Sequence, residues 1–243
     1  MRLPDGSRLL HIGPHKTGTT TIQAALHQSR GALADQGVHY PGTTAHPMLA
    51  ALSAAGGSLP TVQPAEGERR WRELVDDVAA SEARVTVLSS EFFRGASADR
   101  IGSILQALDA ERTHVVVTLR PLCRVLASQW QHYMQNRPGL KYDDDLTYEG
   151  WLEVIFNRPE DETITPSFWR RHRHDRLIRK WVEIVGSDML TAIVVDEADR
   201  RMVLHSFDDS SPTARQILRE LAARARRRLR RVGRLHGGGR EQR

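Results

Sequence analysis

The segment from residue 9 to residue 26 combines groups that bind anions with the elements that would present them. An apolar run, Leu9–Ile12, ends at a Gly13-Pro14 turn, and Lys16 follows two residues later. Gly18 and four threonines, at positions 17, 19, 20 and 21, lead into a helix-like segment. A strand, a tight loop and a helix in this order bring backbone N–H groups and the positive end of the helix dipole to one point. Because Lys16 adds a full positive charge there, the segment predicts a site for an anion.

The order of residues in this loop differs from that of the common nucleoside-triphosphate loop. That loop has a glycine, four residues and then Gly-Lys-Ser/Thr, whereas here the glycine follows the lysine. The order Pro-x-Lys-Thr-Gly-Thr-Thr instead resembles the 5′-phosphosulfate loop of sulfotransferases that use 3′-phosphoadenosine 5′-phosphosulfate (PAPS), and it is most similar to the glycan and bacterial branch. The resemblance implies that the 5′ end of PAPS is bound by Pro14, Lys16, Thr17, Gly18, Thr19 and Thr20. The alternative is a threonine-rich cap on an ordinary helix.

A second group of anion-binding side chains follows the most apolar strand segment, Thr113–Leu119. Arg120, Arg124 and Ser128 are spaced by four residues, so they share one face near the start of the next helix. An arginine at a strand end and a helix hydroxyl can hold one phosphate together. The Arg-x7-Ser spacing is similar to the 3′-phosphate site of the same family, which implies that Arg120 and Ser128 bind the 3′-phosphate. Arg124 is a less specific addition, and taken alone the three residues also fit an ordinary exposed helix face.

Transfer to an alcohol needs a group that accepts its proton. Glu91 follows another buried strand segment and resembles the carboxylate of the glycan-type branch, so we expect it to be the base. Its alternative roles are a helix N-cap partner and an ion pair with Arg94. His15, which adjoins Lys16, is a second candidate base because imidazole titrates near neutral pH, and His132 is a third.

We expect no metal in this site. Lys16 would neutralise the charge that develops on the leaving phosphate, and no His, Cys and Asp cluster has convincing metal spacing. His172, His174 and Asp175 come closest, but the surrounding arginines are more typical of a solvated basic helix start. The expected ligand is therefore PAPS, with adenosine 3′,5′-bisphosphate as the product.

Apolar strand segments alternate with helical segments along the chain. The expected strands are Arg8–Ile12, Gly37–Tyr40, Arg84–Ser89, Thr113–Leu119 and Met189–Val195. Such alternation predicts an α/β protein in which a parallel sheet lies between two helical layers. The resemblance implies the P-loop-NTPase-like sulfotransferase fold, with the site at the carboxyl ends of the strands.

The 243 residues suit one domain with a short appendage. We expect a sulfotransferase domain over 1–212 and an arginine-rich C-terminal helix and tail over 213–243. Eleven arginines and two glutamates lie in residues 215–243, so the rest of the chain is mildly acidic although the net charge is +5. The tail favours a solvated helix; contact with nucleic acid or with an anionic membrane is the alternative.

The acceptor pocket is expected in loops 41–60 and 136–170. The second loop holds aromatic residues that could stack on a sugar or a phenol, or could form the core of a small helical cap: Tyr142, Trp151, Phe156, Phe168 and Trp169. A small-molecule or saccharide acceptor fits better than a polyanion. The lone Cys123 excludes an internal disulfide, is expected to be buried, and favours a cytoplasmic location.

The sequence thus predicts a sulfuryl transferase that moves the group from PAPS to a hydroxyl or amine. Two alternatives remain at this stage. One is a kinase-like nucleotide enzyme, and the other is a non-catalytic module that binds nucleic acid through the basic tail.

Overall fold

A five-stranded parallel sheet is the centre of the fold. The computed structural model describes residues 3–135, 146–159 and 168–195. The strands are β1 (Ser7–His11), β2 (Val38–His39), β3 (Val85–Ser89), β4 (Thr113–Leu119) and β5 (Leu190–Val194). Their order is β2-β3-β1-β4-β5, and every pairing is parallel. This confirms the predicted α/β class with a parallel sheet.

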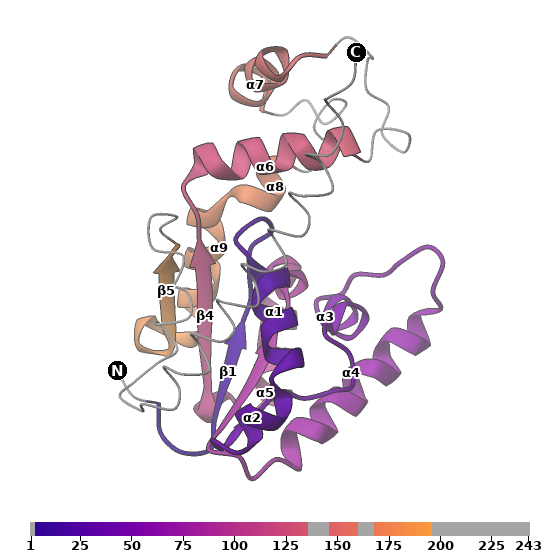
Figure 1. Cartoon of the computed structure of the whole chain (residues 1–243), viewed down its shortest axis with the longest axis vertical. Helices are drawn as coiled ribbons and strands as arrows, with labels where there is room; N and C mark the ends of the chain where they lie inside the picture. Colours follow the sequence, from indigo (N-terminus) through magenta and orange to yellow (C-terminus); the bar gives the residue numbers. More distant parts are fainter. Residues whose placement is uncertain (1–2, 136–145, 160–167, 196–243) are drawn as a thin grey trace, which may run out of the picture. The chain divides into compact units, whose positions relative to one another are not determined.

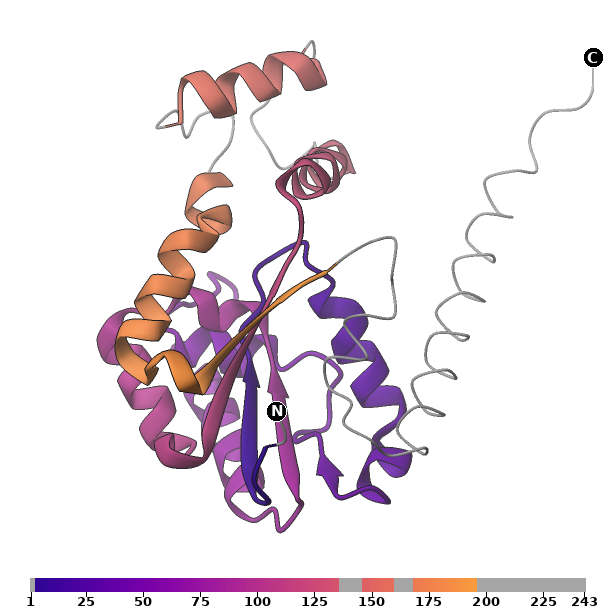
Figure 2. The same cartoon turned by 90° about the vertical axis from the view of Figure 1, so that its left-hand side faces the viewer.

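Helices cover both faces of the sheet (Figures 1 and 2). They are α1 (Thr19–Gln28), α2 (Arg30–Ala34), α3 (Met48–Ala54), α4 (Pro64–Ala79), α5 (Ala98–Ala107), α6 (Leu122–Gln135), α7 (Tyr148–Asn157), α8 (Phe168–His172) and α9 (His174–Val185). Alternate strand residues point to opposite faces. Leu10 and Val117 therefore join the core that contains residues of α3, α4, α5 and α9. Leu9 and Val116 join the opposite core, against which Leu26 of α1 packs.

The carboxyl ends of the central strands meet at one edge of the sheet. The last residue of β1, His11, lies in register with Ser89 of β3 and with Val116 of β4. The segments that follow these strands begin there: the loop after β1, the 3-10 turn η1 (Glu91–Gly95) after β3, and Arg120 after β4. The topology therefore brings the three predicted functional segments to the same edge, as expected for ligand sites in such sheets.

A second, smaller core holds α6, α7 and α8 together beyond this edge (Figure 1). Trp151 and Phe168 are fully buried in it, with their ring centroids 5.6 Å apart. Trp169 is half-buried and donates from Nε1 to the carbonyl of Ile155 at 2.7 Å. Of the two roles left open for these aromatics, Trp151 and Phe168 have the core role. Tyr142 lies outside the described residues.

Several local expectations were wrong. The Thr, Ser, Gly, Pro and Ala of residues 43–65 predict loop with at most one helical turn, but the segment contains α3, whose alanines Ala50, Ala51 and Ala54 are buried against α4. Residues 157–172 predict irregular chain, but their described part includes α8. Cys123 is exposed in the first turn of α6, because the buried side of that helix begins at Val125.

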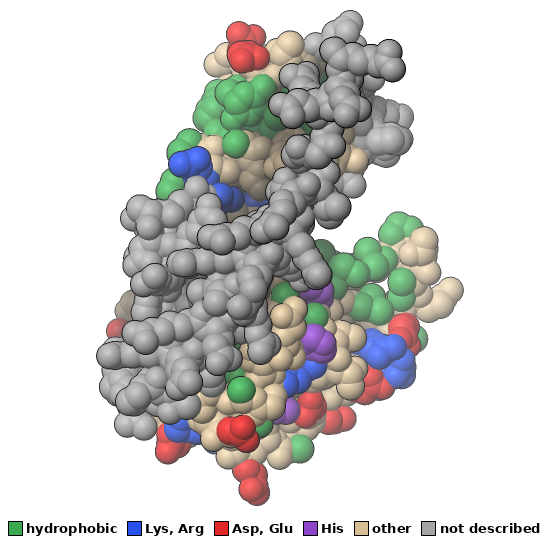
Figure 3. Space-filling view, in the orientation of Figure 1, with side chains coloured by type: hydrophobic (Ala, Val, Ile, Leu, Met, Phe, Trp, Pro, Cys, Tyr) green, Lys and Arg blue, Asp and Glu red, His purple; other side chains and the backbone are tan. Residues whose placement is uncertain are grey.

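The surface of the described part shows ordinary amphipathic helices. Acidic and basic side chains lie together over α4 (Figure 3), where Arg69 and Arg70 pair with Glu66 one turn away. Within the described ranges, no helix has the length and apolarity to cross a membrane. The predicted arginine-rich segment 213–243 lies outside the described residues.

Candidate functional site

The loop between β1 and α1 has a backbone that alternates in handedness. Gly13, Lys16 and Gly18 have φ angles of 69°, 68° and 94°. A positive φ is uncommon for a residue with a side chain and costs about 1 kcal/mol or more, so the surrounding structure must hold Lys16 in this conformation. Such alternation turns successive N–H groups toward one concavity, which is the geometry of an anion-binding nest.

A chain of buried hydrogen bonds fixes this loop to the sheet. Thr17 Oγ1 donates to the carbonyl of Pro14 at 2.7 Å, so its oxygen must accept from Thr118 Oγ1 at 2.9 Å. Because Thr118 donates its only hydroxyl proton to Thr17, it must accept from His11 Nε2 at 3.0 Å. His11 Nδ1 in turn accepts from Ser89 Oγ at 2.8 Å.

These bonds assign His11 as a neutral imidazole with its proton on Nε2. Complete burial agrees with this assignment, because it lowers the pKa of His11 to about 4. The hydroxyl of Thr17 points into this chain, so Thr17 can contribute to anion binding only through its backbone N–H.

The start of α1 completes the concavity. Gly18 is the N-cap residue, and its carbonyl accepts from the N–H groups of Thr21 and Ile22 at 2.9 and 3.1 Å. The N–H groups of the first two helical residues have no acceptor among the described residues. Thr19 Oγ1 is buried and has no hydrogen-bond partner among the described residues, whereas Thr20 is exposed. The first turn therefore offers donors for a bound anion.

Arg120 lies against this loop. Its Nη1 approaches the carbonyl oxygen of Lys16 at 3.4 Å, a long contact that still places the guanidinium beside the concavity. Ser128 is half-buried one helical turn from Arg124, which is exposed. Of the second predicted anion site, the structure thus places Arg120 beside the first.

Glu91 is held next to the loop by close backbone packing and by α1. A Cβ on Gly13 would lie 2.7 Å from both Cα and Cβ of Glu91, so only glycine allows this approach. Gln23 of α1 donates from Nε2 to the carbonyl of Ser89 at 2.8 Å and lies 3.5 Å from Glu91 Oε2. Its amide oxygen contacts His46 Nδ1 at 2.5 Å. Gln23 is a positioning residue that the sequence analysis missed.

His15 lies between Glu91 and a group of cations. Its Nδ1 is 4.0 Å from Glu91 Oε1, and its ring contacts Phe92 edge-on at 5.7 Å. Burial, followed by the charges of Arg94, Arg171 and Lys16, lowers the pKa of His15 to about 3. His15 is therefore neutral at neutral pH and forms no ion pair with Glu91.

Arg94 and Arg171 make the site more basic than the sequence predicted. Burial, together with the charge of Arg171, lowers the pKa of Lys16. Burial lowers the pKa of Arg94 to about 10, with Arg171 and Arg170 as further causes and Glu91 opposing. Arg171 lies in α8, and the sequence analysis assigned the arginines of this segment to a solvated basic helix start. Nothing in the local sequence predicts that Arg171 is half-buried near the loop.

The pKa values of the histidines next to this cluster are lowered, and His172 is buried. Burial lowers the pKa of His172 to about 3, with the nearby His174 as the next cause, and neither ring nitrogen of His172 has a hydrogen-bond partner in the described part. His132, the third candidate base, is near enough to Lys16 and Arg171 for both to lower its pKa after burial does. Across residues 3–135, 146–159 and 168–195, no group of three or more His, Cys, Asp or Glu side chains could hold a metal ion.

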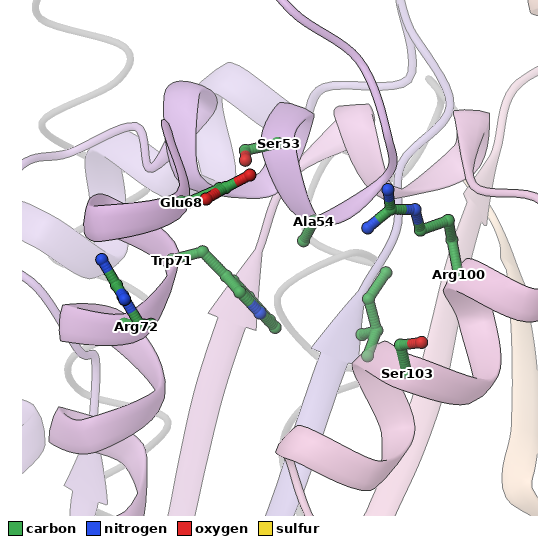
Figure 4. Close-up of a pocket in the computed structure, with 8 residues that line it drawn as sticks. Ser53, Ala54, Glu68, Trp71, Arg72, Arg100 and Ser103 are labelled. Atoms are coloured by element: carbon green, nitrogen blue, oxygen red, sulfur yellow. The ribbon is translucent and has the colours of Figure 1, made fainter. Parts of the chain in front are cut away.

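A separate cleft lies away from the loop. It encloses about 240 Å³ between α3, α4 and α5, and Figure 4 shows Trp71 and Arg100 from two of these helices at its wall. Its lining is Ser53, Ala54, Glu68, Trp71, Arg72, Arg100, Ser103 and Ile104. It contains none of the predicted site residues.

Comparison with known proteins supports the fold. No protein-family model matches the chain, and no curated protein matches it in sequence. The crystal structure of a sulfotransferase from Alicyclobacillus acidocaldarius is similar, with a TM-score of 0.50 over 90% of this chain and 90% of that chain. At 15% identity this likeness shows the fold: an α/β protein with a parallel sheet flanked by helices, as in that sulfotransferase.

We predict that Thr118→Val lowers the free energy of unfolding by about 1–3 kcal/mol, because it leaves the buried His11 Nε2–H without an acceptor. Thr191→Val is the matched control, since the hydroxyl of Thr191 also bonds a histidine, His114 Nε2 at 2.8 Å, but lies at an exposed position where water can replace the lost partner. We expect the control to change stability by less than about 0.5 kcal/mol. Urea unfolding of both variants measures the difference, and equal losses would contradict the role of the buried chain.

We also predict that Gly13→Ala is more destabilising than Gly18→Ala. Both variants place a side chain at a positive φ, which costs about 1–2 kcal/mol. Only Gly13→Ala adds a clash with the backbone of Glu91, for about a further 1–3 kcal/mol, because a Cβ on Gly18 meets nothing within 4 Å. Thermal unfolding of the two variants provides the test, and similar melting temperatures would show that the loop and η1 separate easily.

Proposed function

We propose that the protein is a PAPS-dependent sulfotransferase. The observation that carries the proposal is the geometry of the loop after β1: Lys16 has a positive φ, the start of α1 follows it, and Arg120 Nη1 lies 3.4 Å from the Lys16 carbonyl oxygen at the carboxyl edge of the sheet. The likeness in fold to a bacterial sulfotransferase agrees with this function. PAPS supplies a sulfuryl group on a good leaving group, the phosphate of adenosine 3′,5′-bisphosphate.

The residues present fit this nucleotide. The nest, the donors of Thr19 and the side chain of Lys16 suit the 5′ end, while Arg120 and Ser128 suit the 3′-phosphate. Lys16 Nζ has no acidic partner within the described ranges, so a bound anion is its natural counter-ion. Lys16 stabilises the negative charge that develops on the leaving oxygen, and in a loose transition state such charge stabilisation and positioning are the main work of the protein.

Glu91 is the proposed base, with His15 beside it. The acceptor hydroxyl forms a bond to sulfur while the bond from sulfur to the leaving oxygen breaks, and the hydroxyl proton passes to the carboxylate of Glu91. Gln23 and the close packing on Gly13 hold that carboxylate at the loop. The acceptor is a small molecule or a saccharide, and its identity would come from a labelled-sulfate screen of phenols, saccharides and lipids.

We predict that adenosine 3′,5′-bisphosphate binds more tightly than ATP and without magnesium. Arg120→Ala should weaken this binding by about 2–4 kcal/mol, because a contact between charged groups is lost. Arg112→Ala, which removes an exposed arginine at the other end of β4, serves as the control. Calorimetry measures all three, and tighter magnesium-dependent ATP binding would favour a kinase-like enzyme instead.

We predict that Glu91→Gln lowers turnover about 100-fold or more, which is typical of the loss of a general base, with nucleotide affinity nearly unchanged. His15→Gln, which removes the neighbouring imidazole, should lower turnover much less. Rates of labelled-sulfate transfer to an acceptor from the screen distinguish the two residues. Normal turnover of Glu91→Gln together with loss in His15→Gln would assign the base to His15.

A further inference from the structure

Two half-buried cations near this edge of the sheet have no counter-ion among the residues that the structure describes. Neither the side chain of Lys16 nor that of Arg171 forms a hydrogen bond or an ion pair with any residue that the structure describes. Arg94 is different, because the charge of Glu91 partly offsets its own. Since unpaired charges are costly to bury, Lys16 and Arg171 together indicate a ligand with negative charge.

The fold brings α8 to the loop through η1. Arg94 Nη1 donates to the carbonyl of Arg170 at 3.1 Å, which fixes the backbone next to Arg171. The next link is Phe92, whose ring contacts His15 at 5.7 Å. The charge of Arg171 acts on groups from the loop, α6 and η1, namely Lys16, His132 and Arg94. Arg171 therefore lies among these three elements.

A buried polar group next to Arg171, the imidazole of His172, also lacks a hydrogen-bond partner in the described part of the chain. His172 is 4% exposed, and neither of its ring nitrogens has a hydrogen-bond partner among the described residues. His15 and Arg94 both affect its protonation, so it faces the same cluster. An unpaired buried polar side chain costs free energy unless a bound group satisfies it.

We propose that Arg171 binds the sulfonate end of PAPS, opposite the phosphate end that Lys16 contacts. This inference rests on the proposed function. A phosphosulfate carries one negative charge on its phosphate and one on its sulfonate, which matches the two unpaired cations. The guanidinium offers several donors in a planar fork that suits the oxygens of such a group. Arg171 is thus a specificity residue for the sulfated donor over the desulfated product.

The test compares two nucleotides that differ only in the sulfonate. Calorimetry without an acceptor measures the affinity of wild type, Arg171→Gln and Arg176→Gln for PAPS and for adenosine 3′,5′-bisphosphate. Arg176→Gln is the control because it removes the same charge from an exposed residue of α9. We expect Arg171→Gln to weaken PAPS binding about tenfold or more, as for a lost charged hydrogen bond, and to leave the bisphosphate within about twofold.

Other outcomes overturn the inference. Equal losses for both nucleotides would assign Arg171 to a phosphate, and no loss for either would exclude it from the site. Failure of the wild type to bind either nucleotide would instead refute the proposed function. Circular dichroism and thermal unfolding of each variant, compared with wild type, identify any loss that comes from misfolding.

Discussion

The polar chain from Ser89 through His11 and Thr118 to Thr17 is the constraint on which the site depends. It joins β3, β1, β4 and the loop in the centre of the sheet edge, and each of its four members is 2% exposed or less. The donor and the acceptor of each hydrogen bond in it are fixed, because Thr17 donates to a backbone carbonyl at one end. A buried network of this kind is stable only when every member is satisfied. The loop can therefore hold its left-handed Lys16 without any ligand.

Several basic side chains lie near the same edge of the sheet, with Glu91 as an opposing charge. Glu91 is the carboxylate that acts on Arg94, and burial, followed by the charge of Arg171, lowers the pKa of Lys16 and of Arg94. Burying these cations costs free energy, and under the proposed function a bound anion would offset part of that cost. A bound nucleotide should then stabilise the fold by mass action.

The parts that the sequence predicted are those with local causes. The apolar runs of β1, β3 and β4, the Gly13-Pro14 turn and the spacing of Arg120 from its strand are visible in short windows, and the parallel topology then places them together. Contributions from distant elements had no such signal. The sequence around Gln23 predicts an ordinary helical residue, because only the folded structure shows that Ser89 and Glu91 face it. The local sequence predicts a solvated Arg171, because its half-burial depends on the distant elements α6 and η1. The sequence analysis missed helix α3, because its small alanines are buried by close packing on α4 and do not form an apolar stripe.

Burial and the cations near Lys16 together also prevent His15 from forming an ion pair with Glu91. A protonated His15 only 4.0 Å away would pair with Glu91 and occupy the oxygen that has to accept a proton. Burial, and then the charges of Arg94, Arg171 and Lys16, keep His15 neutral at neutral pH. An anion bound at Lys16 and Arg171 would offset part of this charge, but burial, the largest cause, would remain. The main cause that keeps His15 neutral in the free protein would therefore act in the complex as well. In the proposed reaction, the groups that would hold the anion and the carboxylate of Glu91 that would accept the proton are thus parts of one electrostatic arrangement.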